Sequence, residues 1–128
     1  MDGYMKRTVG VIDVGTNSVL AIGLDEDKAI VYNDYTISEL GRGMVNNDMN
    51  LYDDSIRRTF LIISRFIDKM KELEIDDIFI IGTSCSREAR NIMSLQMLIF
   101  NKYRINYTIL SGDEEARFTY LGALFGFK

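Results

Sequence analysis

TVGVIDVGTNSVLAIGL, residues 8–24, is the stretch that decides the fold of this 128-residue chain. Residues 8–13 alternate β-branched and small side chains, Gly15-Thr16-Asn17 interrupts the pattern, and Val19 to Leu24 resume it. Two such runs joined by turn-forming residues predict a β-hairpin. The hairpin places Asp13 at the end of its first strand, directly before the turn.

Outward from the hairpin, strand and helix patterns alternate along the chain. β-type residues predict a third strand within residues 29–40, and a loop follows. A periodic apolar stripe then predicts a helix that is capped by Asp53 or Asp54 and ends near Leu73. The remaining predicted elements are a buried strand at Asp77 to Gly82, a helix region from Thr83 to Tyr103, a strand at Tyr107 to Leu110 and a helix at Asp113 to Phe127.

The resulting order, β-β-β-α-β-α-β-α, predicts an α/β fold in which helices cover a five-stranded mixed sheet. Ribonuclease H-like lobes of the actin-like ATPase superfamily, which includes sugar kinases, share this order. Residues 1–128 show no internal repeat or linker, so we expect a single lobe. The order of elements does not assign a function.

Composition argues against several classes of function. The chain has 15 basic and 19 acidic residues, a net charge of −4, so no binding of nucleic acid is expected. We find no leader peptide and no apolar run near the ~20 residues of a membrane span, which predicts a soluble, cytoplasmic protein with no membrane partner. Histidine is absent, so acid–base chemistry falls to carboxylates, lysine, tyrosine or water.

The first candidate constellation is DVGTNS at residues 13–18, in the hairpin turn. Gly15 lets the backbone approach a ligand closely, and the turn amides with the hydroxyls of Thr16 and Ser18 can surround phosphate oxygens. Asp13 is a hard oxygen ligand of the kind that Mg²⁺ prefers. A plain hairpin turn rich in turn-forming residues accounts for the same residues equally well.

The second constellation, GTSCSREARN at residues 82–91, runs from a predicted strand into a helix start. Amides and the dipole at a helix N-terminus favour an anion, so Ser84 and Arg87 are candidate phosphate ligands in the first turn. Alternatively, the hydroxyl side chains cap the helix and Arg87 pairs with Glu88 or faces solvent. Cys85 is interpreted as a packing residue, because no histidine is present to activate it.

The third constellation, SGDEEAR at residues 111–117, joins the last strand to the last helix. Ser111 with Glu114 three residues later fits a capping box, which gives Glu114 a structural role. Glu115 remains in the first turn, where its carboxylate could orient and deprotonate a water, although the helix dipole also favours acidic residues there. All three constellations follow strand ends, where ligands gather in open α/β sheets.

Together these segments resemble the Ppx/GppA phosphatase family, which hydrolyses polyphosphate and guanosine pentaphosphate. The resemblance rests on residues 13–18, LGRG at 40–43, residues 83–91 and residues 111–117, in the family's order. It implies the N-terminal lobe of a two-lobed actin-like fold, with polyphosphate or guanosine polyphosphate held between the lobes and Mg²⁺ assisting.

The resemblance assigns a role to each candidate residue. By position, Gly15, Thr16, Asn17 and Ser18 would form the first phosphate loop, Ser84 and Arg87 would bind phosphate, Asp13 would hold the metal, and Glu115 would be the base that activates water for attack on a terminal phosphoryl group. The chain departs from the family at Leu20, where arginine is usual, and at Glu39, where a basic residue is frequent. Weaker ligand binding is therefore expected.

The family's second phosphate loop lies on a second lobe that residues 1–128 do not contain. The chain would then carry half of an active site and hydrolyse polyphosphate negligibly by itself. Apolar residues around the final helix predict a contact with that missing lobe or a homodimer through this helix. Two other readings stay open: a catalytically silent module that senses phosphate ligands or scaffolds a partner, and a lobe of another actin-like ATPase or sugar kinase.

Overall fold

A computed structural model of the chain describes residues 7–117. Five strands form one mixed sheet, as the sequence predicted, and their spatial order is β3-β2-β1-β4-β5. The elements are β1 (Val9–Val14), β2 (Ser18–Leu24), β3 (Ile30–Ile37), the 3-10 helix η1 (Met44–Asn47), α1 (Asp53–Glu72), β4 (Asp77–Gly82), α2 (Ser84–Glu88), α3 (Ile92–Tyr103) and β5 (Tyr107–Ile109). Residues 112–117 are helical as well.

Strand β1 lies at the centre of the sheet and organises it. It pairs antiparallel with β2, as the hairpin requires, and parallel with β4, so that Val14 lies opposite both Val19 and Gly82. Strand β5 adds parallel to β4, and β3 adds antiparallel to β2. Because β1, β4 and β5 run in the same direction, their carboxyl ends meet at one edge of the sheet.

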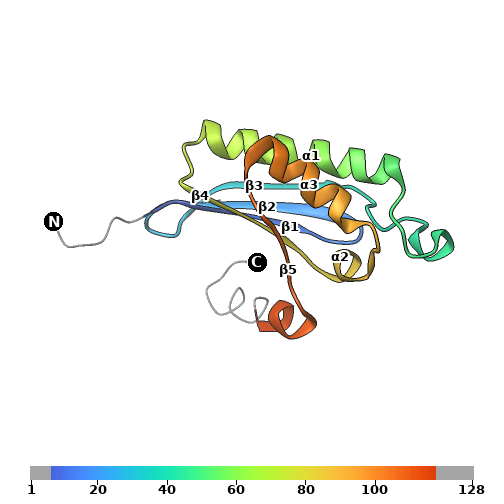
Figure 1. Cartoon of the computed structure of the whole chain (residues 1–128). Coiled ribbons are helices and arrows are strands. Elements are labelled where there is room, and N and C mark those ends of the chain that lie inside the picture. Colours follow the sequence, from blue (N-terminus) through green and yellow to red (C-terminus); the bar gives the residue numbers. More distant parts are fainter. Residues whose placement is uncertain (1–6, 118–128) are drawn as a thin grey trace.

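The core lies between the sheet and helices α1 and α3, which cover one of its faces (Figure 1). Along β1, Ile12 and Val14 are fully buried, whereas Asp13 between them is only partly buried. Side chains alternate along a strand, so Asp13 lies on the opposite face of the sheet. The helical residues 112–117 lie on that opposite side (Figure 1).

Helix α1 supplies the apolar stripe that the sequence predicted. Its buried apolar residues include Ile56, Ile63, Ile67 and Met70, while Phe60 is partly buried against the same core. Its charged residues lie on the other side, and no helix within residues 7–117 is both long and apolar enough to cross a lipid bilayer.

The predicted cap of α1 is wrong. The capping residue is Tyr52, which makes no side-chain capping hydrogen bond, and Asp53 and Asp54 lie inside the first turn. Acidic residues are stabilising there because they face the positive end of the helix dipole. The two aspartates therefore support the start of α1 by charge rather than by capping.

The helix region predicted from Thr83 to Tyr103 is two helices, because contacts with a distant loop break it. At Ala89 the backbone is extended, with φ −72° and ψ 124°. The Arg90 N–H donates to the Met49 carbonyl at 2.8 Å, and the Asn91 side chain bonds both the N–H and the carbonyl of Leu51. These long-range bonds replace the helical ones that the segment would otherwise make.

The final predicted helix, Asp113 to Phe127, is present in its first part. The structure shows a helix through residues 112–117. The rest of that prediction, and the predicted dimer contact of the same helix, lie outside the described residues.

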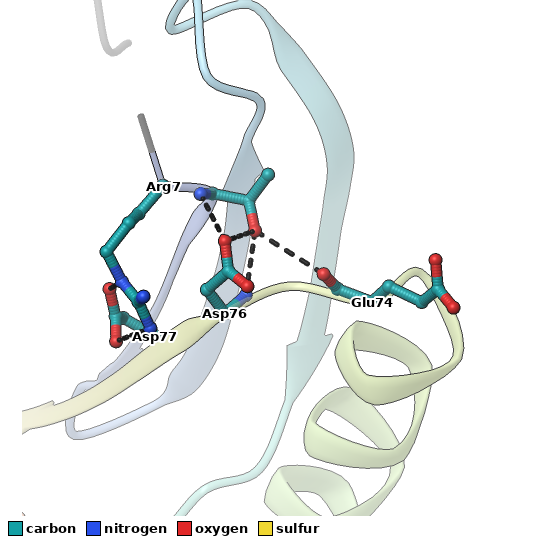
Figure 2. Close-up of polar contacts among 5 residues, drawn as sticks. Arg7, Glu74, Asp76 and Asp77 are labelled. Atoms are coloured by element: carbon teal, nitrogen blue, oxygen red, sulfur yellow. Dashed lines mark hydrogen bonds and ion pairs between the residues drawn. The ribbon is translucent and has the colours of Figure 1, made fainter. Parts of the chain in front are cut away.

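A polar cluster fixes the start of β1 against the start of β4 (Figure 2). The Asp76 carboxylate accepts hydrogen bonds from the Thr8 N–H at 3.0 Å and the Thr8 hydroxyl at 3.1 Å, which lower the pKa of Asp76. Arg7 donates to both oxygens of Asp77, which lowers the pKa of Asp77. The cluster secures the β1–β4 register at the end of the sheet opposite the predicted site.

We expect Gly82→Ala to destabilise the fold, because the new methyl would lie 2.5 Å from both Ser86 Oγ and Tyr107 Cε1. These two side chains are buried and joined by a 2.6 Å hydrogen bond, so neither moves aside readily. The expected loss is about 1–3 kcal/mol of unfolding free energy, measured by chemical denaturation. Gly10→Ala is the matched control, since its methyl would meet the flexible Met70 side chain. Equal losses in both variants would contradict the prediction.

Candidate functional site

The three constellations meet at the carboxyl ends of β1, β4 and β5. The Thr83 N–H donates to the Val14 carbonyl at 3.3 Å, which joins the segment after β4 to the hairpin turn. The Leu110 N–H donates to the Gly82 carbonyl at 2.9 Å, which joins the segment after β5 to the end of β4. The sheet topology thus brings together segments that are far apart in the sequence.

An ion pair connects the second and third constellations. Arg87 Nη1 lies 2.9 Å from Glu115 Oε1 and donates a second hydrogen bond, also of 2.9 Å, to the Leu110 carbonyl. The alternative interpretation, in which Arg87 pairs with Glu88 or faces solvent, is therefore wrong, because Arg87 pairs with Glu115. The Leu110 carbonyl is a site group that the sequence did not indicate, because a backbone acceptor leaves no signal in residue types.

Asp13 belongs to the same cluster of charges. Its pKa is raised, first by burial and then by the negative charge of Glu115. Because the Asp13 side chain and the helical residues 112–117 are on the same side of the sheet, the two carboxylates approach each other there. The site therefore holds two carboxylates and one guanidinium.

One backbone amide of the hairpin turn forms a hydrogen bond within the turn itself. The Gly15 N–H donates to the Ser18 carbonyl at 2.9 Å, so this amide is not available to a ligand. The turn is therefore not a loop in which every amide could face phosphate. Within residues 7–117, no hydrogen bond engages the amides of Thr16 or Asn17. These two amides are the donors that the turn can offer to an anion.

The LGRG segment packs directly on the site. A Cβ at Gly41 would lie 2.8 Å from Thr16 Cγ2 and 3.2 Å from Cys85 Sγ, so only glycine lets this segment pack so closely against both the hairpin turn and α2. The Gly41 N–H also donates to the Thr16 carbonyl at 3.0 Å. This contact was not predicted, although a glycine in an otherwise ordered segment is a signal of close approach.

Helix α2 differs from the predicted anion-binding helix start. It has only five residues, with Arg87 in its last turn rather than its first, so its dipole contributes little. The N-cap Thr83 makes no side-chain capping bond, and Ser84 is exposed. Cys85 is buried, which raises the pKa of its thiol to about 11 and agrees with a packing role.

The predicted capping box is confirmed. The Ser111 N–H donates to Glu114 Oε1 at 2.9 Å, and the Glu114 N–H donates to Ser111 Oγ at 3.1 Å. The Glu114 side chain therefore caps the start of the helix. Its neighbour Glu115, one position further, is the carboxylate that reaches Arg87.

The two departures from the family pattern lie close to the site. Leu20 is paired with Asp13 across the β1–β2 ladder and so lies beside it on the same face of the sheet. An apolar side chain there leaves Asp13 without a cationic neighbour on β2. Glu39 forms an ion pair of 3.1 Å with Arg42, so its charge is compensated locally.

The residues present fit a magnesium ion. Within residues 7–117, no three histidine, cysteine or acidic residues gather as a metal site, but Mg²⁺ needs only one or two carboxylates when phosphate and water complete its shell. Asp13, half-buried and repelled by Glu115, is a carboxylate that a divalent cation would stabilise. Asp13 is thus the residue that would hold the ion.

The five-stranded mixed sheet with its helices is a ribonuclease H-like, actin-like lobe, and its strand ends gather an arginine and two carboxylates. Residues 23–128 match the model of the Ppx/GppA phosphatase family, and the chain belongs to this family. The hairpin turn at residues 13–18 precedes the matched range.

Several known proteins are similar to this chain. The bifunctional 3-dehydroquinate synthase/phosphatase of Fusobacterium nucleatum is 30% identical over 127 residues, covering 91% of this chain and 19% of the relative. An exopolyphosphatase from Cytophaga hutchinsonii superposes with a TM-score of 0.81 at 23% identity, over 87% of this chain and 36% of its own. An Aquifex aeolicus member of the Ppx/GppA family gives a TM-score of 0.80 at 20% identity, over 91% and 39%. The two structures show the fold, and this chain spans well under half the length of all three proteins.

We expect Asp13→Asn to raise the free energy of unfolding at pH 7. The raised pKa means that ionised Asp13 destabilises the folded state, and that this cost disappears as the pH falls through the folded pKa toward the ordinary value of 3.8. The stability advantage of the variant should therefore shrink in acid, as measured by denaturation at several pH values. In a Glu115→Gln background the gain should be smaller, because one source of repulsion is already gone. A variant less stable than the parent at pH 7 would refute this account.

Proposed function

We propose that this chain is the phosphate-binding lobe of a phosphoanhydride hydrolase that acts on polyphosphate or guanosine pentaphosphate. The observation that carries the proposal is the Arg87–Glu115 ion pair beside Asp13 at the strand ends. Membership of the Ppx/GppA phosphatase family supports phosphate ester or anhydride chemistry. The likeness to an exopolyphosphatase makes polyphosphate the first substrate to test.

In this proposal Arg87 exchanges one anion for another. A terminal phosphoryl group offers oxygens that compete with Glu115 for the guanidinium, and arginine can bind phosphate through two parallel hydrogen bonds. The exchange would break the Arg87–Glu115 ion pair at the moment when substrate is in place. The free amides of Thr16 and Asn17 would contact further phosphate oxygens.

The chemical step then requires a positioned water. Glu115 accepts a proton from the water, whose oxygen forms a bond to the terminal phosphorus while the bridging P–O bond breaks and its electron pair leaves with the shortened chain. Mg²⁺ bound at Asp13 would supply positive charge to the phosphate oxygens. The protein's contribution is mainly orientation and charge neutralisation.

Half of the site would come from a second lobe, so the isolated chain should bind substrate and hydrolyse it negligibly. A catalytically silent phosphate sensor is the second candidate, and Leu20 favours it because the usual arginine beside Asp13 is missing. Family membership sets aside a sugar kinase or other ATPase lobe.

We expect Arg87→Gln to weaken the binding of guanosine pentaphosphate to the isolated chain by roughly tenfold or more, because a charge-assisted contact to phosphate is lost. Glu115→Gln should instead tighten binding, since it removes both a competitor for Arg87 and a negative charge. Isothermal titration calorimetry measures both effects. Weaker binding in both variants would mean that the ion pair holds the site together rather than competing with ligand.

Catalysis is best tested in a chimera in which residues 1–128 replace the N-terminal lobe of an exopolyphosphatase. We expect Glu115→Gln to lower phosphate release from polyphosphate by about 10²–10⁴-fold, the usual contribution of a general base. Glu114→Gln is the matched control, and it should affect stability but not the rate, because Glu114 only caps the helix.

Each alternative leaves a distinct result in that assay. Equal rates for the parent chimera and Glu115→Gln would remove Glu115 from the mechanism. A folded chimera that binds polyphosphate without hydrolysing it would favour the silent sensor.

A further inference from the structure

A groove of about 480 Å³ lies on α1, apart from the strand-end site. Successive turns of α1 line the groove with residues from one face of the helix: Asp54, Arg57, Arg58, Leu61, Ile62 and Arg65. Contacts from Arg58 to Ser38 and from Arg65 to Thr36 place the groove along the flank where α1 meets edge strand β3. Three of the six lining residues are arginines.

Within residues 7–117, the arginines of this α1 groove are not held in ion pairs, although one carboxylate, that of Asp54, also lines the groove. In the part of the chain that the structure describes, Arg57, Arg58 and Arg65 take part in no ion pair, whereas Arg42 and Arg87 each have a carboxylate partner within 4.0 Å. Asp54 lines the end of the groove nearest the helix start and lies beyond ion-pair distance.

Neutral acceptors fix two of these arginines in place. Arg58 Nε donates to the Ser38 carbonyl at 2.6 Å, and its Nη2 donates to Ser55 Oγ at 3.3 Å. Arg65 Nη2 donates to Thr36 Oγ1 at 2.8 Å. Carbonyls and hydroxyls orient a guanidinium without neutralising it, so the groove is preorganised for an anion.

The α1 groove and the strand-end site share a segment of backbone. Arg58 donates to the carbonyl of Ser38, and the Ser38 N–H donates to the Asn17 carbonyl at 2.9 Å. Three residues further, the Gly41 N–H donates to the Thr16 carbonyl. The loop at residues 38–41 therefore has the hairpin turn on one side and the groove on the other.

We propose that the α1 groove is a second anion-binding site, and that its ligand is a linear polyphosphate. Arg58 and Arg65 are seven residues apart, about 10 Å along the helix axis, and are held on different acceptors, Ser38 and Thr36, which favours an extended ligand over a single phosphate. An acidic peptide would gain more from apolar surface, but here only Leu61, 59% exposed, offers any, since Ile62 is 6% exposed. The choice of phosphate over other polyanions rests on the proposed function.

The test measures the affinity of a fluorescently labelled polyphosphate, some tens of units long, for the chain and its variants by anisotropy in about 0.1 M salt. We expect Arg57→Gln/Arg65→Gln to weaken binding by roughly tenfold, since two charged contacts are lost. The matched control, Lys71→Gln/Lys102→Gln, removes the same charge from exposed positions outside the groove and should bind like the parent. Orthophosphate should not displace the probe from the groove.

The same comparison in an Arg87→Gln background separates the two sites. A loss that persists there belongs to the α1 groove, and it stands even if the chimera shows no hydrolysis. If Arg87→Gln alone removes binding and the groove variant binds like its control, the groove proposal is overturned while the strand-end site remains.

Two further measurements test whether the ligand is an acidic protein segment and whether each variant is folded. Polyglutamate is the alternative probe: if the groove variant loses polyglutamate but keeps polyphosphate, the ligand is an acidic protein segment and the proposal is wrong. Circular dichroism and thermal unfolding establish that each variant is folded. Should Arg57→Gln/Arg65→Gln be unfolded, Arg57→Lys/Arg65→Lys keeps the charge but loses the paired hydrogen bonds, and an affinity equal to the parent's would then count against guanidinium recognition of phosphate.

Discussion

The parallel pairing of β1 with β4 is the constraint on which the rest of this molecule depends. It joins residues more than sixty positions apart, so it has to be specified at both ends. At the start of the strands Thr8 binds the Asp76 carboxylate, and at their carboxyl ends the Thr83 N–H binds the Val14 carbonyl. A shift of register by one residue would turn Asp13 toward the core and move the hairpin turn away from α2. Both the core and the strand-end site therefore follow from one ladder.

The carboxylates of the strand-end site destabilise the folded state. Burial of the Asp13 carboxylate raises the free energy of the folded state, and the nearby negative charge of Glu115 adds to it. Arg87 compensates one of the two by pairing with Glu115. The cluster is thus self-neutralised only in part, and the proposed binding of a cation and a phosphate would account for that imbalance. A purely structural ion pair between Arg87 and Glu115 would not need the second carboxylate, that of Asp13.

The sequence predicted the features that depend on local pattern. The five strands, the stripe of α1 and the Ser111–Glu114 capping box all follow from the spacing of residue types and are present in the structure. Apart from the cap of α1, which is Tyr52 rather than Asp53 or Asp54, what it missed depends on partners distant in the chain. The interruption at Ala89 to Asn91 comes from bonds to the loop that includes Leu51, and the Arg87–Glu115 pair required knowledge of which strands are neighbours. Helix propensity and motif spacing carry no information on either.

The arginines of this lobe present two different environments to an anion. In the proposed function, a phosphate at Arg87 would displace the Glu115 carboxylate, and this displacement would end the ion pair between Glu115 and Arg87. At Arg58 and Arg65 no carboxylate is displaced, so binding there changes no protonation state and leaves the guanidinium groups on their neutral acceptors. Under the two proposals, occupancy at Arg87 would be coupled to the chemical step, whereas occupancy of the α1 groove would contribute affinity alone. Since both places border the loop at residues 38–41, that loop is the element through which one could sense the other.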